Sequence, residues 1–195
     1  MLSAITNELE LEAAAPASGI VVRKAAMRDI SAILSLINGY ATEGVMLPRT
    51  EFELSENMRD FAVAFAGEQL VGCGALHFYS PVVGEIRSLA VSPSVKTRGI
   101  GRNIIRFLLT EAKDYYLGAV FAFTYVPGFF SRMGFMEVER GALPLKAWKD
   151  CLRCPKFQNC DEIAVLRVLD AGLWDPAVLA SPEPDVLIQL PTPRK

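Results

Sequence analysis

The sequence predicts an α+β domain in which helices flank one mixed central sheet. Short runs rich in Val, Phe and Ala are typical of buried strands. They alternate with segments whose apolar residues recur every three to four positions, as in amphipathic helices. A glycine-rich turn joins a strand that ends at Val91 to a helix that begins near Ile100. A second turn, Gly67-Glu68-Gln69, joins two further strands as a hairpin.

The elements before the glycine-rich turn follow from local patterns. Residues 20–23 form a short apolar strand, and a helix then runs from Asp29 to near Gly39, because its isoleucines recur at helical spacing. Thr50 and Glu53 have the spacing of a capping box, which predicts the start of a short second helix. Three strands are expected next, over 61–66, 70–79 and 84–91.

The elements after the turn are predicted in the same way. The helix from Ile100 to about Tyr116 is the clearest, since Ile104 and Leu108 continue its i, i+4 spacing. Pro127 suits the first position of a short helix that ends near Gly134. The remaining elements are strands over 119–125, 135–139 and 162–169, and one or two helical turns over 143–149.

Length and composition bound the domain organisation. The chain has 195 residues, of which 51% are hydrophobic and 22% are charged. This is enough for one domain with a substantial core. We expect a flexible arm over 1–19, a single domain over 20–170 and a Pro-rich tail over 171–195.

Charge and hydropathy exclude several classes of partner. The net charge is −2, so no bulk positive charge is present to neutralise nucleic-acid phosphates. No apolar run reaches the roughly 20 residues that a membrane span needs. The acidic N-terminal segment lacks the basic region of a secretory signal, and we therefore expect a cytoplasmic protein that binds neither nucleic acid nor membrane.

The glycine-rich turn has the chemistry of an anion site. Gly99 and Gly101 lack Cβ atoms, so a ligand can approach the backbone closely. The unpaired N–H groups and the dipole at the start of the following helix favour negative charge. Lys96, Arg98 and Arg102 add positive side chains. The turn is interpreted as a diphosphate site, and a plain strand-to-helix connection is the alternative; the dinucleotide and Walker spacings are absent.

The spacing Lys96-x-x-Gly99-x-Gly101 resembles the acyl-CoA signature of the GNAT acetyltransferase superfamily. The order of elements over about 20–170, with Gly134-Phe135 after the short helix, is similar to GNAT domains. Within that superfamily, three segments resemble N-acetylglutamate synthases: 84–93, 48–50 and 143–151. The pattern Cys-x-x-Cys-Pro-Lys-Phe at 151–157 resembles the stand-alone, short form of these enzymes.

The resemblance implies the acyl-CoA N-acyltransferase fold, with acetyl-CoA as co-substrate and no metal. Two departures from the family pattern are visible. The chain has no room for the arginine-binding amino-acid-kinase domain of the longer synthases, and Phe130 stands where many GNAT members have a tyrosine that protonates the thiolate. Resemblance and turn chemistry together assign coenzyme binding to Leu89, Ala90, Val91, Lys96, Thr97, Arg98, Gly99, Ile100, Gly101 and Arg102.

Two residues are candidates for proton transfer. By resemblance, Glu85 is the base that deprotonates the acceptor amine; the alternative is an outward-facing glutamate paired with a surface arginine. Tyr125 is the candidate acid for the departing thiolate, with Ser131 nearby in the sequence. The alternatives are a thiolate that leaves unaided and, for Tyr125, a packed aromatic at the end of a strand. The resemblance also implies that the strand diverges from its neighbour near Leu89, where backbone N–H groups would polarise the thioester carbonyl.

An acidic acceptor requires cationic partners for its carboxylates. Arg49 and Arg87 are the first candidates, followed by Ser88, Lys146 and Lys149, with a solvated surface charge as the alternative for the charged residues. Arg87 follows Glu85 by two residues, so both side chains can point to one face of the sheet. His77 is interpreted as a strand residue without a catalytic role.

These observations predict transfer of an acetyl group from acetyl-CoA to the α-amine of a small anionic amino acid. L-glutamate is the expected acceptor, which would make the chain an N-acetylglutamate synthase of arginine biosynthesis. Direct attack in a ternary complex is expected, since no cysteine or serine has an activating base beside it. The alternatives are glutamine or another amine as acceptor, and a non-catalytic CoA-binding module; a homodimer is left open.

The cysteines suggest a second, weaker hypothesis. Cys73 lies in an apolar strand and is expected in the core. Cys151, Cys154 and Cys160 could provide three thiolates for zinc, and a fourth ligand would have to be Asp161 or His77; three thiols without a nearby histidine are an incomplete set. We therefore expect no metal.

Overall fold

The computed structural model describes residues 19–95, 99–143 and 154–175. The predicted N-terminal arm, the larger part of the C-terminal tail and the helical turns expected over 144–149 lie outside the described residues. The same holds for Lys96, Thr97, Arg98, Lys146 and Cys151.

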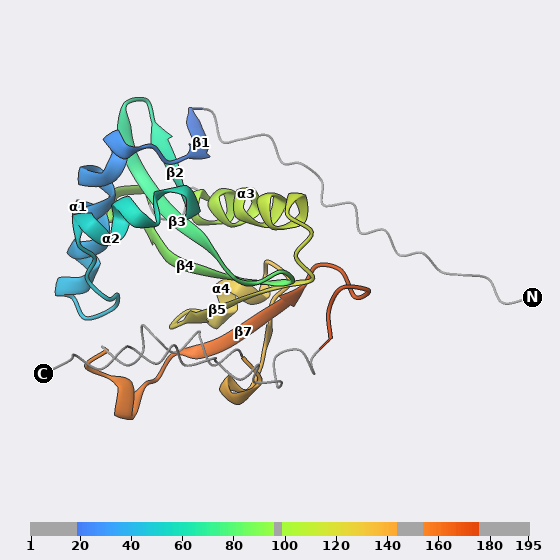
Figure 1. The fold of residues 1–195 in the computed structure, drawn as a ribbon. Helices are drawn as coiled ribbons and strands as arrows, with labels where there is room; N and C mark the ends of the chain where they lie inside the picture. Colours follow the sequence, from blue (N-terminus) through green and yellow to red (C-terminus); the bar gives the residue numbers. More distant parts are fainter. Residues whose placement is uncertain (1–18, 96–98, 144–153, 176–195) are drawn as a thin grey trace, which may run out of the picture.

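One mixed sheet organises the molecule, as predicted (Figure 1). Its strands lie in the order β1-β2-β3-β4-β5-β7-β6, and β4 with β5 is the parallel pair among antiparallel neighbours. The strands are β1 (Ile20–Lys24), β2 (Phe61–Ala66), β3 (Gln69–Ser80), β4 (Val83–Val91), β5 (Ala119–Thr124), β6 (Met136–Glu137) and β7 (Ile163–Val168).

Helices cover both faces of the sheet. The α-helices are α1 (Ile30–Thr42), α2 (Glu51–Glu56), α3 (Ile100–Asp114) and α4 (Pro127–Ser131). Short 3-10 turns are η1 (Met27–Asp29), η2 (Met58–Asp60), η3 (Pro93–Val95), η4 (Arg140–Ala142) and η7 (Phe157–Asn159). In the described part of the chain, no helix is both long and apolar enough to cross a membrane.

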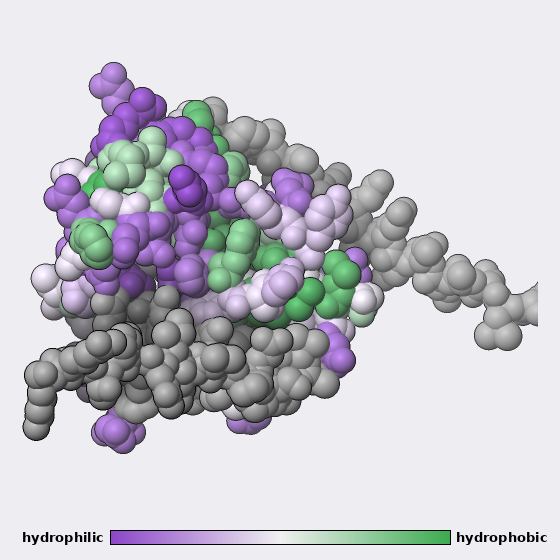
Figure 2. All heavy atoms as spheres, in the orientation of Figure 1, coloured by the Kyte–Doolittle hydropathy of each residue, from purple (hydrophilic) through white to green (hydrophobic). Residues whose placement is uncertain are grey.

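The alternation of side chains along the strands divides the core between the two faces. Ala62 and Ala64 of β2 pack with the buried isoleucines of α3, whereas Val63 between them packs with Ile33 and Ile37 of α1. A third cluster lies over the β5–β7 half of the sheet, around Phe121. Figure 2 shows mostly hydrophilic side chains over the α1 and α2 side, with apolar side chains reaching the surface toward the middle of the view.

Several predicted boundaries differ from the structure; the short helix expected to end near Gly134, for example, ends at Ser131. The first helix does not end near Gly39 but continues for another turn to Thr42. A long-range contact accompanies this turn, since the Tyr40 hydroxyl donates a 2.6 Å hydrogen bond to the carbonyl of Val91. The strand expected over 135–139 is only Met136–Glu137, because it is an edge strand with both residues exposed.

Close packing of α3 against β3 gives a test of the fold. A Cβ atom built on Gly72 would lie 2.9 Å from Ile104 Cδ1 and 3.2 Å from the Ala90 carbonyl oxygen. We therefore expect Gly72→Val to lower the free energy of unfolding by about 1–3 kcal/mol through overpacking. Urea unfolding measures this difference.

A matched glycine gives the opposite expectation. Gly39 lies inside α1, and a Cβ atom added there would meet no atom within 4 Å, so Gly39→Ala should raise the free energy of unfolding by about 0.5–1 kcal/mol. Equal unfolding midpoints for Gly72→Val and the wild-type chain would contradict the described packing.

Candidate active site

The two halves of the sheet separate at its centre. Among the described residues, the parallel pairing of β4 with β5 covers only Val83–Glu85 and Ala119–Phe121. Both strands continue past this point, β4 to Val91 and β5 to Thr124, and they diverge (Figure 1). A cleft of about 970 Å³ opens between them.

A β-bulge changes the direction of β4 inside this cleft. Arg87 pairs with Ala75 and Ala90 with Cys73, so Ser88 and Leu89 together oppose the single residue Gly74. Ser88 has a φ of 54°, in the left-handed region that few non-glycine residues adopt. The extra residue reverses the alternation of side chains. Ile86 and Leu89 therefore both pack on the α3 side of the sheet.

The start of α3 forms one end of the cleft. Gly99 precedes the helix with a φ of 75°, a conformation that strongly favours glycine, and a Cβ atom added there would meet no atom within 4 Å. The N–H groups of the first helical turn have no partner within the helix and can serve an anion. All described residues predicted to bind coenzyme line the cleft: Leu89, Ala90, Val91, Gly99, Ile100, Gly101 and Arg102.

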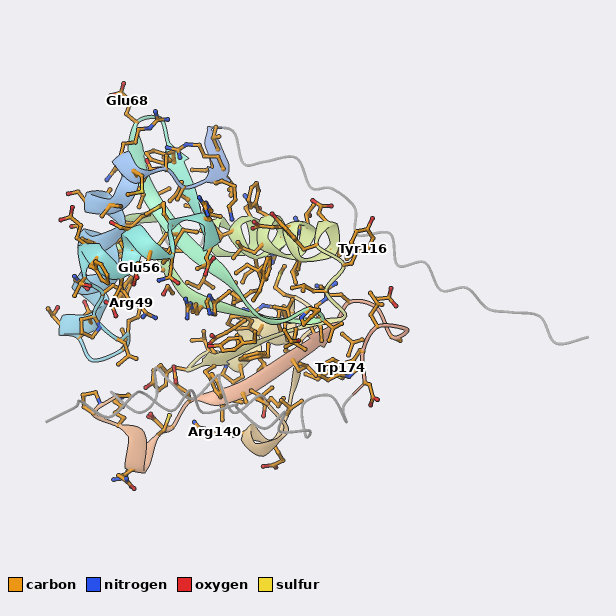
Figure 3. All side chains as sticks on the ribbon, in the orientation of Figure 1. Arg49, Glu56, Glu68, Tyr116, Arg140 and Trp174 are labelled. Atoms are coloured by element: carbon orange, nitrogen blue, oxygen red, sulfur yellow. The ribbon has the colours of Figure 1, made fainter. Side chains whose placement is uncertain are left out.

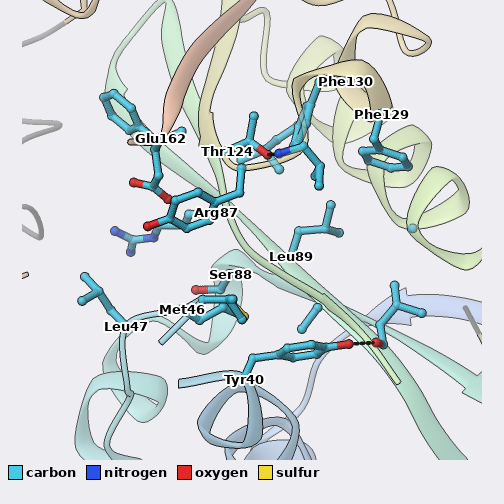
Figure 4. A pocket seen from close by; sticks show the side chains of 18 of the residues that line it. Tyr40, Met46, Leu47, Arg87, Ser88, Leu89, Thr124, Phe129, Phe130 and Glu162 are labelled. Atoms are coloured by element: carbon cyan, nitrogen blue, oxygen red, sulfur yellow. Dashed lines mark hydrogen bonds between the residues drawn. The ribbon is translucent and has the colours of Figure 1, made fainter. Parts of the chain in front are cut away.

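The other walls come from segments far apart in the sequence. Figure 4 shows Ser88 and Leu89 of β4, with Tyr40, Met46 and Leu47 on one side and Thr124, Phe129 and Phe130 on the other. Residues after β6 complete the wall on the β5–β7 half of the sheet. These are Arg140, Cys154, Pro155, Lys156, Cys160 and Glu162.

Glu85 lies at the deep end of the cleft, where β4 and β5 part. It is 8% exposed and lines the cleft, so it is not the outward-facing surface glutamate of the alternative interpretation. The Tyr79 hydroxyl donates a 2.9 Å hydrogen bond to Glu85 Oε2. A buried carboxylate of this kind can accept a proton from a bound cationic amine.

Arg87 lines the cleft two residues further along β4. Its side chain is 10% exposed, and its Nη2 atom lies 3.3 Å from Asn57 Oδ1 and 3.7 Å from Asp60 Oδ2. Asp60 Oδ2 also lies 2.7 Å from His77 Nδ1, so Asp60 connects His77 to Arg87. Neither Asn57 nor Asp60 was predicted from the sequence, because Asn57 precedes and Asp60 ends a short 3-10 turn without a recognisable motif.

Arg49 faces the cleft from the α1–α2 side, and Figure 3 shows it across from Arg140. Its backbone is held by Asn38, whose amide nitrogen donates to the Arg49 carbonyl at 3.0 Å and whose amide oxygen accepts from the Arg49 N–H at 2.9 Å. Its side chain is 13% exposed, and its Nη1 atom lies 4.0 Å from Glu53 Oε1. The capping box predicted at Thr50 and Glu53 is formed, which fixes the loop immediately after Arg49.

Tyr125 lines the cleft at the end of β5. Its hydroxyl lies 3.4 Å from Lys156 Nζ, which also stands 4.8 Å from the ring centroid. Burial raises the pKa of the Tyr125 phenol, so the group is protonated at neutral pH and can donate a proton. Burial also raises the pKa of Glu162 in the same wall. Lys156 and Glu162 were not predicted as site residues.

The cysteines divide between core and cleft. Cys73 is fully buried, and burial raises its pKa to about 12. Cys154 and Cys160 line the cleft, and Arg140 Nη2 lies 3.1 Å from Cys160 Sγ. Among the described residues, no group of three or more His, Cys, Asp or Glu side chains could hold a metal ion. Cys151, the third thiol of the predicted set, lies outside the described residues.

Similar sequences agree with the chemistry of the cleft. Residues 30–135 match the sequence model described as the Acetyltransferase (GNAT) family. An uncharacterized N-acetyltransferase of Chlorobaculum tepidum is 42% identical over 154 residues, which cover 79% of this chain and 99% of the relative. The amino-acid acetyltransferase of Mycobacterium tuberculosis is 34% identical over 164 residues, 83% of this chain and 90% of the relative.

Solved structures share the fold. A Mycobacterium tuberculosis protein in complex with CoA and NLQ has a TM-score of 0.65 at 33% identity, covering 76% of this chain and 99% of that one. The N-acetylglutamate synthase of Neisseria gonorrhoeae, complexed with coenzyme A and N-acetyl-glutamate, has a TM-score of 0.70 at 26% identity. That match covers 77% of this chain but only 35% of the synthase.

Proposed function

This chain belongs to the GNAT acetyltransferase family and is an acetyl-CoA-dependent N-acetyltransferase; on that premise we propose that its acceptor is the α-amine of L-glutamate. The observation that supports this most directly is that a buried carboxylate, Glu85, lines the same cleft as the side chains of Arg49 and Arg87. Arg49 and Arg87 suit the two carboxylates of the acceptor, and Glu85 suits its ammonium. The activity would supply N-acetylglutamate for arginine biosynthesis in the cytoplasm.

The coenzyme would lie along the diverging edge of β4. We assign its diphosphate to the N–H groups at the start of α3 and its pantetheine arm to the backbone of Leu89 and Val91, as an added strand. This mode needs no side-chain specificity. It brings the thioester toward the bulge at Ser88, where backbone N–H groups can polarise the carbonyl. We assign this chemistry to a single catalytic domain that comprises residues 20–170.

The reaction would proceed by direct attack in a ternary complex. An α-ammonium group with a pKa near ~9 is mostly protonated at neutral pH, so Glu85 first accepts its proton, directly or through water. The amine then attacks the thioester carbon, the C–N bond forms, and the C–S bond breaks as the tetrahedral intermediate collapses. Tyr125 is assigned as the donor that protonates the departing CoA thiolate, and the amine's remaining excess proton passes to solvent.

An acceptor panel tests the proposal. Release of CoA thiol from acetyl-CoA would be measured with glutamate, glutamine, aspartate and a primary amine that carries no carboxylate, all at equal concentrations. We expect the highest kcat/KM with glutamate, because only this acceptor places two carboxylates at the spacing of a five-carbon amino diacid. A higher kcat/KM with glutamine or with the amine that lacks a carboxylate would overturn the assignment of the acceptor.

A further inference from the structure

Tyr79 contacts Glu85 but is not among the described residues that line the cleft. It is near the end of β3, and its hydroxyl donates to Glu85 Oε2 at 2.9 Å. Glu85 itself lines the cleft, so this hydrogen bond connects Tyr79 to the site. We therefore expect any effect of the Tyr79 hydroxyl on acetyl transfer to act through the carboxylate.

The ring of Tyr79 is held by two aromatic neighbours. It meets His77 edge to face, with ring centroids 5.1 Å apart, and lies 5.5 Å from the ring centroid of Phe121. His77 and Phe121 are also the residues paired with Glu85 on β3 and β5. The strand register that places Glu85 thus also places the hydroxyl that contacts it.

We propose that Tyr79 is a positioning residue for Glu85, which fixes the orientation of the carboxylate and stabilises its charged form. This inference rests on the proposed role of Glu85 as the base. Removing a carboxylate from water disfavours its charge, and a hydrogen bond donated to the charged form offsets that cost. A base held in this way begins the reaction ionised and aimed at the acceptor.

Other charged and titratable groups surround the pair and enter the interpretation of any titration. His77 and Arg87 come from the neighbouring strand positions, and Asp60 lies at the end of η2 in contact with both. Across the cleft the β5–β7 half contributes Tyr125, Arg140, Lys156 and Glu162. Tyr79→Phe replaces none of these side chains and removes only the Tyr79 hydroxyl, so a change in the titration of Glu85 is attributed to the loss of that hydroxyl.

Tyr79→Phe isolates the hydroxyl, because it keeps the ring between His77 and Phe121. The measurement is a 13C NMR titration of glutamate carboxyls in the free, full-length enzyme, with the Glu85 signal assigned by its loss in Glu85→Gln. We expect the titration midpoint of Glu85 to move upward by about one pH unit in Tyr79→Phe. The acid limb of kcat/KM should move in the same direction, with little change on the plateau.

Tyr116→Phe is the matched control, since Tyr116 is 79% exposed at the far end of α3 (Figure 3). It should leave both the midpoint and the pH profile unchanged. An unchanged Glu85 midpoint in Tyr79→Phe, recorded below the melting transition of the variant, would overturn the inference. Because the titration needs no acceptor, it decides the role of Tyr79 even if the acceptor panel shows that glutamate is not the substrate.

Discussion

Glu85→Gln is expected to lower kcat by about 10²- to 10⁴-fold, the range in which a general base contributes to proton transfer. Glutamine keeps the size of the side chain and can still accept the Tyr79 hydrogen bond, but it cannot take a proton from the ammonium group of the acceptor. The KM for the acceptor should change much less than kcat, because the substitution removes no carboxylate-binding group. Steady-state kinetics with acetyl-CoA at saturation measure both constants.

A second glutamate controls for the loss of a charge. Glu56 is exposed at the end of α2, and Glu56→Gln should leave kcat unchanged within error. Raising the pH offers a further check. Because an amine that is already deprotonated needs no base, the difference in kcat between Glu85→Gln and the wild-type enzyme should become smaller. A kcat for Glu85→Gln equal to that of the wild-type enzyme would remove Glu85 from the mechanism.

Local sequence patterns were sufficient for most of the architecture. The α3 helix, the hairpin between β2 and β3 and the glycine turn before Ile100 all depend on residues within a few positions of one another. The pairing of Glu85 and Arg87 on one side of the sheet also follows from simple alternation, since the bulge begins only after Arg87. The family resemblance then predicted which residues bind the coenzyme, and the described ones among them line one cleft.

Features set by long-range contacts could not be predicted. The bulge at Ser88 has no glycine to signal its positive φ, and it depends on the register between β3 and β4. Tyr79 reaches Glu85 only because that same register is fixed. Asn38 holds the backbone of Arg49 from a position where local patterns alone predict the end of a helix.

Arg49→Ala is expected to raise the KM for glutamate by about 10- to 100-fold, because charge-assisted hydrogen bonds to a carboxylate are among the strongest polar contacts. The effect on kcat should be small, since Arg49 is assigned to binding and not to proton transfer. Arg49→Lys keeps the positive charge but loses the planar, two-pronged donor geometry of the guanidinium. The KM of this variant for glutamate should lie between those of the wild-type enzyme and Arg49→Ala. The KM is measured from initial rates over a range of glutamate concentrations at saturating acetyl-CoA.

The structure also separates a binding role from a structural one. The loop is held through the backbone of Arg49 by Asn38, so Arg49→Ala keeps both of those hydrogen bonds and should leave the melting temperature close to that of the wild-type enzyme. Arg59 is an exposed arginine of η2, and Arg59→Ala controls for the loss of one positive charge from the same side of the molecule. If Arg49 binds a carboxylate, its removal should raise the KM for glutamate far more than the KM for an amine acceptor that carries no carboxylate. An equal rise in KM for both acceptors would show that the guanidinium shapes the loop and does not select the substrate.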